Sequence, residues 1–192
     1  HFDECTPVQE QTIPHILNQS DVIGIAQTGT GKTAAYLLPL LTLLKEQSHP
    51  ADAVNCLIMA PTRELAKQID QSLQGFAYFL NINGVAVYGG NDGERYEQER
   101  RSLKQGADIV IATPGRLITH LQLGSLDLSR TTHLVLDEAD RMLDMGFYED
   151  IMKIVNEMPR NRQTILFSAT MPDKINELAK SIMNNPIEVK LA

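Results

Sequence analysis

Short apolar runs alternate with stretches of helical periodicity along this 192-residue sequence. A parallel strand that helices cover on both faces is apolar throughout, whereas a helix that covers it has an apolar residue at every third or fourth position. The apolar runs predict strands at residues 22–26, 54–60, 84–88, 108–112, 133–137, 164–168 and 187–191. This alternation predicts an α/β fold, a parallel β-sheet flanked by helices on both faces.

Helical periods lie between these runs. Residues 62–80 have apolar side chains at steps of three or four, and so do residues 147–158 and 175–183. Each of these stretches predicts a helix with one buried stripe. Residues 94–105 are highly charged and contain few apolar side chains, so we expect a helix whose face is solvated.

Charge and cysteine content limit the classes of protein that remain. The net charge of −7 argues against a nucleic-acid-binding protein, since such proteins usually carry a basic excess. It does not exclude one, because only charges within a Debye length of the contact surface act on the ligand. No apolar run approaches the roughly 20 residues that cross a bilayer. Cys5 and Cys56 lie in no metal-binding pattern, which disfavours a zinc site and favours a reducing, cytoplasmic location.

A glycine-rich loop follows the first predicted strand. Its sequence is Ala26-Gln27-Thr28-Gly29-Thr30-Gly31-Lys32-Thr33, and it leads into a helical stretch. Glycines allow successive backbone N–H groups to point at one anion, and the positive end of the next helix points to the same place. The loop therefore predicts a phosphate site in which Lys32 binds the β- and γ-phosphates and Thr33 ligates Mg²⁺. The general P-loop pattern has a glycine where this chain has Ala26.

An acidic cluster follows the predicted strand at residues 133–137. Asp137-Glu138-Ala139-Asp140 would lie at a strand tip, where a P-loop ATPase needs a carboxylate for Mg²⁺ and a group that positions the attacking water. We expect Asp137 to face the metal and Glu138 to face the water. Acidic residues also favour helix starts for dipole reasons alone. The phosphate loop upstream favours the functional interpretation.

The same four residues spell the motif that names the DEAD-box helicases, and the other motifs follow in that family's order. Thr6-Pro7-Val8-Gln9 resembles the Q motif, and residues 26–33 resemble motif I, in which alanine is usual at the first position. Residues 61–65, 89–90, 113–116 and 168–170 resemble motifs Ia, GG, Ib and III. The chain thus resembles the N-terminal RecA-like domain of a DEAD-box ATP-dependent RNA helicase, a P-loop NTPase domain.

The resemblance implies ATP and Mg²⁺ as cofactors and assigns roles to matching residues. The residues that would bind nucleotide are Thr6, Gln9, Gln27, Thr28, Gly29, Thr30, Gly31, Lys32 and Thr33. Thr33 and Asp137 would hold the metal, and Lys32, Asp137 and Glu138 would serve catalysis. Gln9 would contact the adenine edge through its amide and so favour ATP over GTP.

The resemblance also implies an RNA surface and a link between the two ligands. The residues that would contact the RNA backbone, without reading sequence, are Pro61, Thr62, Arg63, Gly90, Thr113 and Arg116. Asp140, Ser168 and Thr170 would couple the nucleotide site to RNA, with Ser168 and Thr170 bonding toward the acidic motif.

Residues 1–192 would form a single domain, the first of a two-domain helicase core. The chain ends too soon after Thr170 to hold a second domain, which in this family supplies arginines that stabilise the transferring phosphoryl group. The expected partners are RNA and the C-terminal RecA-like domain of the full-length chain, with no membrane, and the fragment would be a monomer. We expect it to bind nucleotide with Mg²⁺, to hydrolyse it poorly and not to unwind duplexes.

Two other interpretations stay open. The first is a P-loop motor that acts on DNA, although such proteins usually differ at the fourth letter of the acidic motif and lack the Gln9 element. The second is a non-catalytic RNA clamp or protein-docking module, which would have no need of Lys32, Thr33, Asp137 and Glu138 together. Comparing single-stranded RNA with DNA as ligand would separate the first from the helicase.

Overall fold

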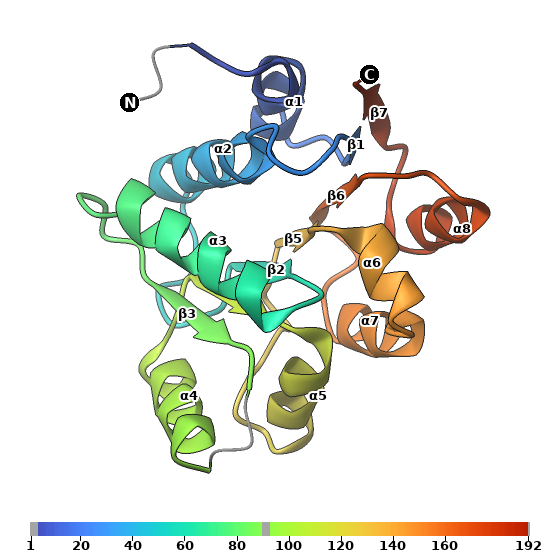
Figure 1. Ribbon diagram of the computed structural model, residues 1–192. Helices are drawn as coiled ribbons and strands as arrows, with labels where there is room; N and C mark the ends of the chain where they lie inside the picture. The colour runs from blue at the N-terminus through green and yellow to red at the C-terminus, as the bar shows by residue number, and fades with distance from the viewer. Residues whose placement is uncertain (1–3, 90–92, 192) are drawn as a thin grey trace.

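The computed structural model describes residues 4–89 and 93–191, which form seven strands and eight helices around one sheet (Figure 1). The strands are β1 (Val22–Ile25), β2 (Cys56–Met59), β3 (Gly84–Val87), β4 (Ile109–Ala112), β5 (His133–Leu136), β6 (Gln163–Ser168) and β7 (Ile187–Lys190). The helices are α1 (Pro7–Leu17), α2 (Lys32–Glu46), α3 (Arg63–Phe76), α4 (Gly93–Gln105), α5 (Pro114–Gln122), α6 (Ala139–Asp144), α7 (Tyr148–Asn156) and α8 (Asp173–Ile182).

Every pairing in the sheet is parallel, and the strand order is β3-β4-β2-β5-β6-β1-β7. All seven predicted strands are present, each within two residues of its expected limits. Strands β1, β2, β4, β5 and β6 are buried along their whole length, as their continuous apolar sequences predicted. The α/β prediction is confirmed.

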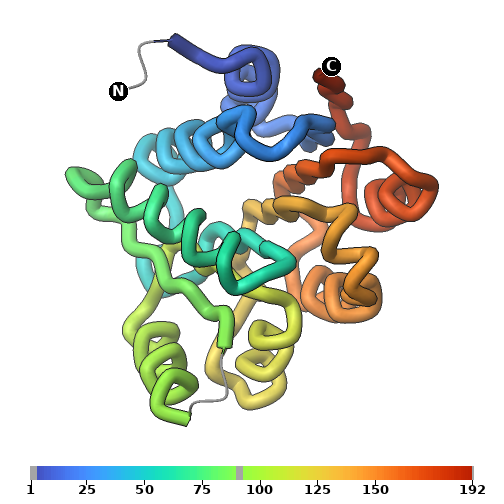
Figure 2. Tube along the Cα trace, in the orientation of Figure 1, coloured from blue at the N-terminus to red at the C-terminus, as the bar shows by residue number. Residues whose placement is uncertain are grey.

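Helices cover both faces of the sheet, and alternate residues of each strand enter one of two cores. On β1, Val22 packs in the core that α1, α2 and α3 cover, whereas Ile23 packs in the core that α5 to α8 cover. Figure 2 shows α1 to α3, blue to green, lying together, while the orange and red helices α6 to α8 lie together at the right of the view. Over residues 4–89 and 93–191, no helix is long and apolar enough to span a membrane.

The parallel order places the carboxyl ends of all strands on one edge of the sheet. In α/β sheets this edge is where ligands bind. Strand β6 separates β5 from β1, so the loops that follow these three strands share one half of the edge. The loops that follow β3, β4 and β2 share the other half. The phosphate loop and the acidic motif fall in the first half, and residues 61–63 and 113–116 fall in the second.

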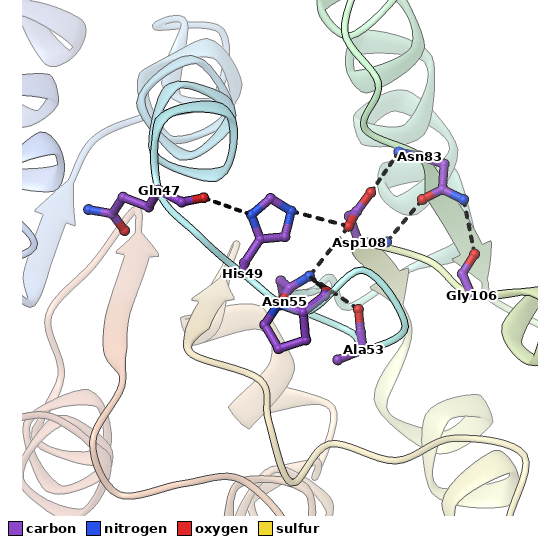
Figure 3. Close-up of polar contacts among 8 residues, drawn as sticks. Gln47, His49, Ala53, Asn55, Asn83, Gly106 and Asp108 are labelled. Carbon is purple, nitrogen blue, oxygen red and sulfur yellow. Dashed lines mark hydrogen bonds and ion pairs between the residues drawn. The ribbon is translucent and has the colours of Figure 1, made fainter.

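The opposite edge carries a polar network around the buried Asp108, just before β4 (Figure 3). Asn55 Nδ2 donates to Asp108 Oδ1 at 3.3 Å, and His49 Nε2 lies 3.5 Å from the same oxygen. The backbone N–H of Asn83 donates to Asp108 Oδ2 at 3.2 Å, and Asn83 Oδ1 accepts from the Asp108 N–H at 3.1 Å. One carboxylate thus ties together the segments that begin β2, β3 and β4.

This network should contribute measurably to stability. Asp108→Ala leaves the Asn55 amide and the Asn83 N–H without their acceptor, so we expect the free energy of unfolding to fall by about 2–4 kcal/mol. Urea denaturation followed by far-UV circular dichroism measures it. Asp52→Ala, which removes an exposed carboxylate paired with Arg130, is the control and should stay close to wild type. Equal stability of the two variants would show that the Asp108 network does not hold the strand starts together.

Candidate functional site

The glycine loop between β1 and α2 adopts a conformation that its glycines permit. Gly29 and Gly31 have φ angles of 85° and 83°, in the left-handed region that residues with a Cβ rarely occupy. A Cβ at Gly31 would also lie 2.6 Å from Gln9 Nε2. Thr30 Oγ1 donates to the Gln27 carbonyl at 2.7 Å and closes the loop. Gly31 is the N-cap of α2, so the loop opens at the positive end of that helix.

Gln9 fastens α1 to this loop. Its Nε2 donates to the Gly31 carbonyl at 3.0 Å, and its Oε1 accepts from the Thr6 N–H at 3.0 Å. Thr6 Oγ1 accepts from the Gln9 N–H at 3.4 Å, which completes a capping box at the start of α1. The Gln9 amide keeps one further N–H and one further lone pair for another ligand.

Lys32 and Asp137 meet at the centre of this half of the edge. Lys32 is 6% exposed and Asp137 is fully buried, and Lys32 Nζ lies 3.5 Å from Asp137 Oδ1. The pair is at ion-pair distance without hydrogen-bond geometry, and neither atom has a hydrogen-bond partner among the described residues. Burying an ammonium or a carboxylate oxygen that lacks hydrogen-bond partners costs free energy, unless a ligand supplies those partners.

Glu138 follows Asp137 with φ 51° and ψ 51°, a left-handed conformation that is unusual for a residue with a side chain. Such strain costs about 1–3 kcal/mol and is concentrated at functional sites. Thr170 Oγ1 donates to Asp140 Oδ2 at 3.0 Å. Ser168 Oγ donates to the Thr170 carbonyl at 2.6 Å, so Ser168 reaches Asp140 only through Thr170.

Tyr36 completes the surroundings of Asp137. It is fully buried on α2, and its hydroxyl donates to Asp137 Oδ2 at 2.8 Å. Burial and the negative charge of Asp137 raise the pKa of Tyr36 well above its usual value, and an interaction with the Thr33 side chain acts in the opposite direction. The Tyr36 hydroxyl therefore stays protonated and remains a donor at neutral pH.

The second half of the edge carries the other motifs. Thr62 and Thr113 are the N-caps of α3 and α5, and Thr62 Oγ1 accepts from the Leu65 N–H at 3.2 Å. Pro61 is buried, whereas Arg63 is exposed. Gly90, predicted to contact RNA, lies outside the described residues. The structure brings the rest of this predicted set to one edge.

Glu99, on α4, joins the loops of this half. It is only 4% exposed. Its Oε2 accepts from the backbone N–H groups of Tyr88 and Gly89 at 3.1 and 3.3 Å. Its Oε1 accepts from Arg116 Nε at 2.7 Å and from His120 Nε2 at 3.1 Å. The expectation of a solvated helix at residues 94–105 is therefore wrong at Glu99, because the carboxylate has exchanged water for four donors.

These donors decide the charge state of Glu99. Burial alone would raise its pKa, but the hydrogen bonds from His120, Arg116 and the Gly89 N–H outweigh that effect and lower the pKa below its usual value. Arg116 also stacks over Tyr96, with its guanidinium carbon 5.0 Å from the ring centroid, and its Nη2 is buried without a hydrogen-bond partner in the described parts of the chain. The Nε of Arg116 therefore donates to Glu99, whereas its Nη2 has no hydrogen-bond acceptor among the described residues.

Three cations surround Tyr88, next to Gly89. The guanidinium carbon of Arg95 lies 3.9 Å from the ring centroid, and Arg63 and Lys67 Nζ lie at 5.8 and 5.6 Å. Cations at these distances are attracted by the ring face. Although the chain is acidic overall, this half of the edge is therefore locally basic.

Comparison with known proteins agrees with this geometry. The DEAD/DEAH box helicase family model matches residues 6–178. The chain belongs to this family. It is 48% identical over 192 residues to the ATP-dependent RNA helicase DeaD of Haemophilus influenzae, covering 99% of this chain and 30% of DeaD. It is 47% identical over 190 residues to the ATP-dependent RNA helicase CshA of Listeria monocytogenes, covering 99% of this chain and 35% of CshA.

Solved structures of helicases have the same fold. The yeast DEAD-box splicing factor Prp28 superposes with a TM-score of 0.93 at 34% identity, over 100% of this chain and 46% of Prp28. A hypothetical ATP-dependent RNA helicase from Sulfolobus tokodaii gives a TM-score of 0.87 at 37% identity, over 99% of this chain and 54% of that protein. The sheet is therefore that of a RecA-like DEAD-box helicase domain. The chain spans about a third of the length of the curated relatives it matches.

Two residues of this helicase domain, Tyr36 and Glu99, were not predicted from the sequence. Tyr36 lies in a largely apolar helix and could not be told from a core aromatic, and Glu99 lies among other charged residues. Position i+4 from Lys32 was the only sequence signal for Tyr36. No local signal distinguished Glu99 from its exposed neighbours.

The buried Glu99 should make stability depend on pH in a defined window. Glu99→Gln removes the charge that balances Arg116, so we expect the free energy of unfolding to fall by about 2–4 kcal/mol at pH 7. Because the folded pKa is lowered, the wild-type advantage is fully present above the usual pKa of about 4.3 and is lost as pH falls through the folded value.

Urea denaturation at pH 7, 5, 4 and 3.5 tests this. The difference between wild type and Glu99→Gln should narrow only below about pH 4.3. Glu97→Gln is the matched control, because Glu97 lies on the same helix and its side chain is 47% exposed in its pair with Arg100. A constant difference across the whole range would contradict the assigned charge state.

Proposed function

We propose that this chain is the ATP- and Mg²⁺-binding domain of an ATP-dependent RNA helicase. The observation that carries the proposal is the buried pair of Lys32 Nζ and Asp137 Oδ1, each without a hydrogen-bond partner among the described residues, at the mouth of the glycine loop. A phosphate oxygen would accept a hydrogen bond from the Lys32 ammonium, and the Asp137 carboxylate would coordinate a divalent cation. The residues present therefore fit both groups.

Nucleotide would bind along the loop from Gln27 to Thr33. Backbone N–H groups of residues 28–31 and the start of α2 would hold the phosphates, and Lys32 would leave Asp137 to pair with them. Gln9, fixed at Thr6 and Gly31, would offer its remaining N–H and lone pair to the adenine edge. A base whose edge has donors and acceptors in the opposite positions to those of adenine would form poorer hydrogen bonds with the Gln9 amide.

Catalysis would use the acidic motif. Thr33 and Asp137 would hold Mg²⁺, which when bound would offset negative charge on the phosphates. Glu138, whose backbone conformation turns it away from the run of β5, would position or deprotonate the attacking water. The contacts Thr170–Asp140 and Ser168–Thr170 would couple the nucleotide site to the RNA surface.

RNA would lie across the ends of β2, β3 and β4. Pro61, Thr62, Arg63, Gly90, Thr113 and Arg116 would contact its backbone, which gives affinity without sequence preference. The locally basic surface at Arg63, Lys67 and Arg95 supports this assignment despite the net charge of −7. The unused Nη2 of Arg116 is a donor suited to a phosphate oxygen.

The complete reaction would also require a second RecA-like domain, as the resemblance implies. The isolated, monomeric 192-residue chain would bind nucleotide, hydrolyse it poorly and not unwind duplexes. A cytoplasmic location fits the two cysteines, both of which are free.

Nucleotide titration tests the proposal. The chain should bind ADP with Mg²⁺ measurably more tightly than GDP, and Lys32→Ala should weaken ADP binding by about 10- to 100-fold, because a charge-assisted contact to phosphate is worth about 1.5–3 kcal/mol. Isothermal titration calorimetry measures both. Lys45→Ala, at the exposed far end of the same helix, is the matched control and should bind as wild type.

Gln9→Ala separates the base contact from the phosphate contact in the same experiment. It should reduce the preference for ADP over GDP, whereas the lost bond from Gln9 to the Gly31 carbonyl should affect both nucleotides alike. Equal affinity of the wild type for ADP and GDP, or unaltered ADP binding by Lys32→Ala, would contradict the proposed site. Absence of all nucleotide binding would favour a non-catalytic RNA clamp or docking module.

A further inference from the structure

Asp137 is contacted on both oxygens by side chains of one helix. Lys32 and Tyr36 are four residues apart on α2 and so project from the same face. Lys32 Nζ lies 3.5 Å from Oδ1, and the Tyr36 hydroxyl donates to Oδ2 at 2.8 Å. The helix that begins at the glycine loop therefore holds the carboxylate at the tip of β5, across the intervening strand β6.

The contacts of Lys32 and Tyr36 with Asp137 differ in whether another group can take their place. Lys32 is at the loop, where a phosphate oxygen could take the place of Asp137 Oδ1. Tyr36 is fully buried, with its ring packed on Phe167 at a centroid distance of 5.7 Å. Among the described residues, Asp137 Oδ2 is the one acceptor that the Tyr36 hydroxyl bonds to. Moving that hydroxyl away from Asp137 would leave a buried donor unsatisfied, so this bond should persist when Lys32 moves.

We propose that Tyr36 is a positioning residue for the metal site. Its hydroxyl fixes Asp137 Oδ2 and so keeps Oδ1 directed toward the nucleotide when Lys32 releases it. Tyr36 would touch neither nucleotide nor metal. It would act through Asp137, and its hydroxyl also interacts with the side chain of Thr33, the other proposed metal ligand. This inference rests on the proposed function, since it concerns how the same site receives Mg²⁺.

The inference predicts an effect on metal affinity and not on nucleotide affinity as such. Loss of a partner that orients a metal-ligating side chain typically weakens metal binding by about 10- to 100-fold. Tyr36→Phe keeps the ring and its packing on Phe167 while it removes the hydroxyl. ADP binding in the presence of EDTA should stay within about twofold of wild type, because Lys32 and the loop are unchanged.

The experiment titrates Mg²⁺ into the 192-residue chain saturated with ADP, for wild type, Tyr36→Phe and Tyr96→Phe. Tyr96 is the matched control, because its hydroxyl is also buried but lies on α4 beside Arg116. We expect the apparent Mg²⁺ affinity to fall about tenfold or more in Tyr36→Phe and to stay unchanged in Tyr96→Phe. Thermal unfolding of each variant shows whether the fold is retained.

Each other outcome overturns a distinct statement. Wild-type Mg²⁺ affinity in Tyr36→Phe, with MgADP still bound, would overturn the role of Tyr36 and leave the proposed function intact. An equal loss of ADP affinity with and without Mg²⁺ would show that Tyr36 supports the loop and not the carboxylate. Failure of the wild type to bind ADP at any Mg²⁺ concentration would overturn both proposals.

Discussion

The burial of one carboxylate, Asp137, determines how this end of the molecule is organised. A fully buried anion is tolerated only when donors and positive charge surround it. Here α2 supplies both, through Tyr36 and Lys32, and α2 starts from the glycine loop. The contacts to Asp137 therefore fix the relative positions of the glycine loop, α2 and the tip of β5. Phe167 of β6 packs against Tyr36 between them.

A second buried carboxylate organises the other half of the same edge. Glu99 binds the backbone after β3 and the side chains of Arg116 and His120 on α5. At the opposite edge, Asp108 binds Asn55 and Asn83, and over residues 4–89 and 93–191 neither asparagine has a buried side-chain atom without a hydrogen-bond partner. Buried carboxylates therefore do two jobs in this fold. Those at the carboxyl edge lie beside buried donors, Lys32 Nζ and Arg116 Nη2, that have no hydrogen-bond partner among the described residues, whereas Asp108 closes a structural network.

Local sequence predicted the elements better than it predicted their contacts. Strands such as β2 and β4 were evident because continuous apolar runs have few alternatives to a sheet that is covered on both faces. The phosphate loop was evident because its glycine positions and following helix are a local pattern. Three features depend on contacts between residues that are separated in the sequence: the strand order, the bond from Tyr36 to Asp137 and the burial of Glu99. Periodicity in the sequence does not encode such contacts. A solvated α4 was predicted from the average behaviour of charged residues. Glu99 departs from it because its donors lie in the segment after β3 and on α5.

Lys32 and Asp137 are proposed to be the residues that receive phosphate and metal. A crystal structure of this chain with Mg²⁺ and a non-hydrolysable ATP analogue tests it most directly. We expect Lys32 Nζ to leave Asp137 for phosphate oxygens and the cation to lie beside Thr33 and Asp137. Tyr36 should keep its bond to Asp137. Nucleotide bound elsewhere, or Lys32 still paired with Asp137 beside a bound nucleotide, would contradict it.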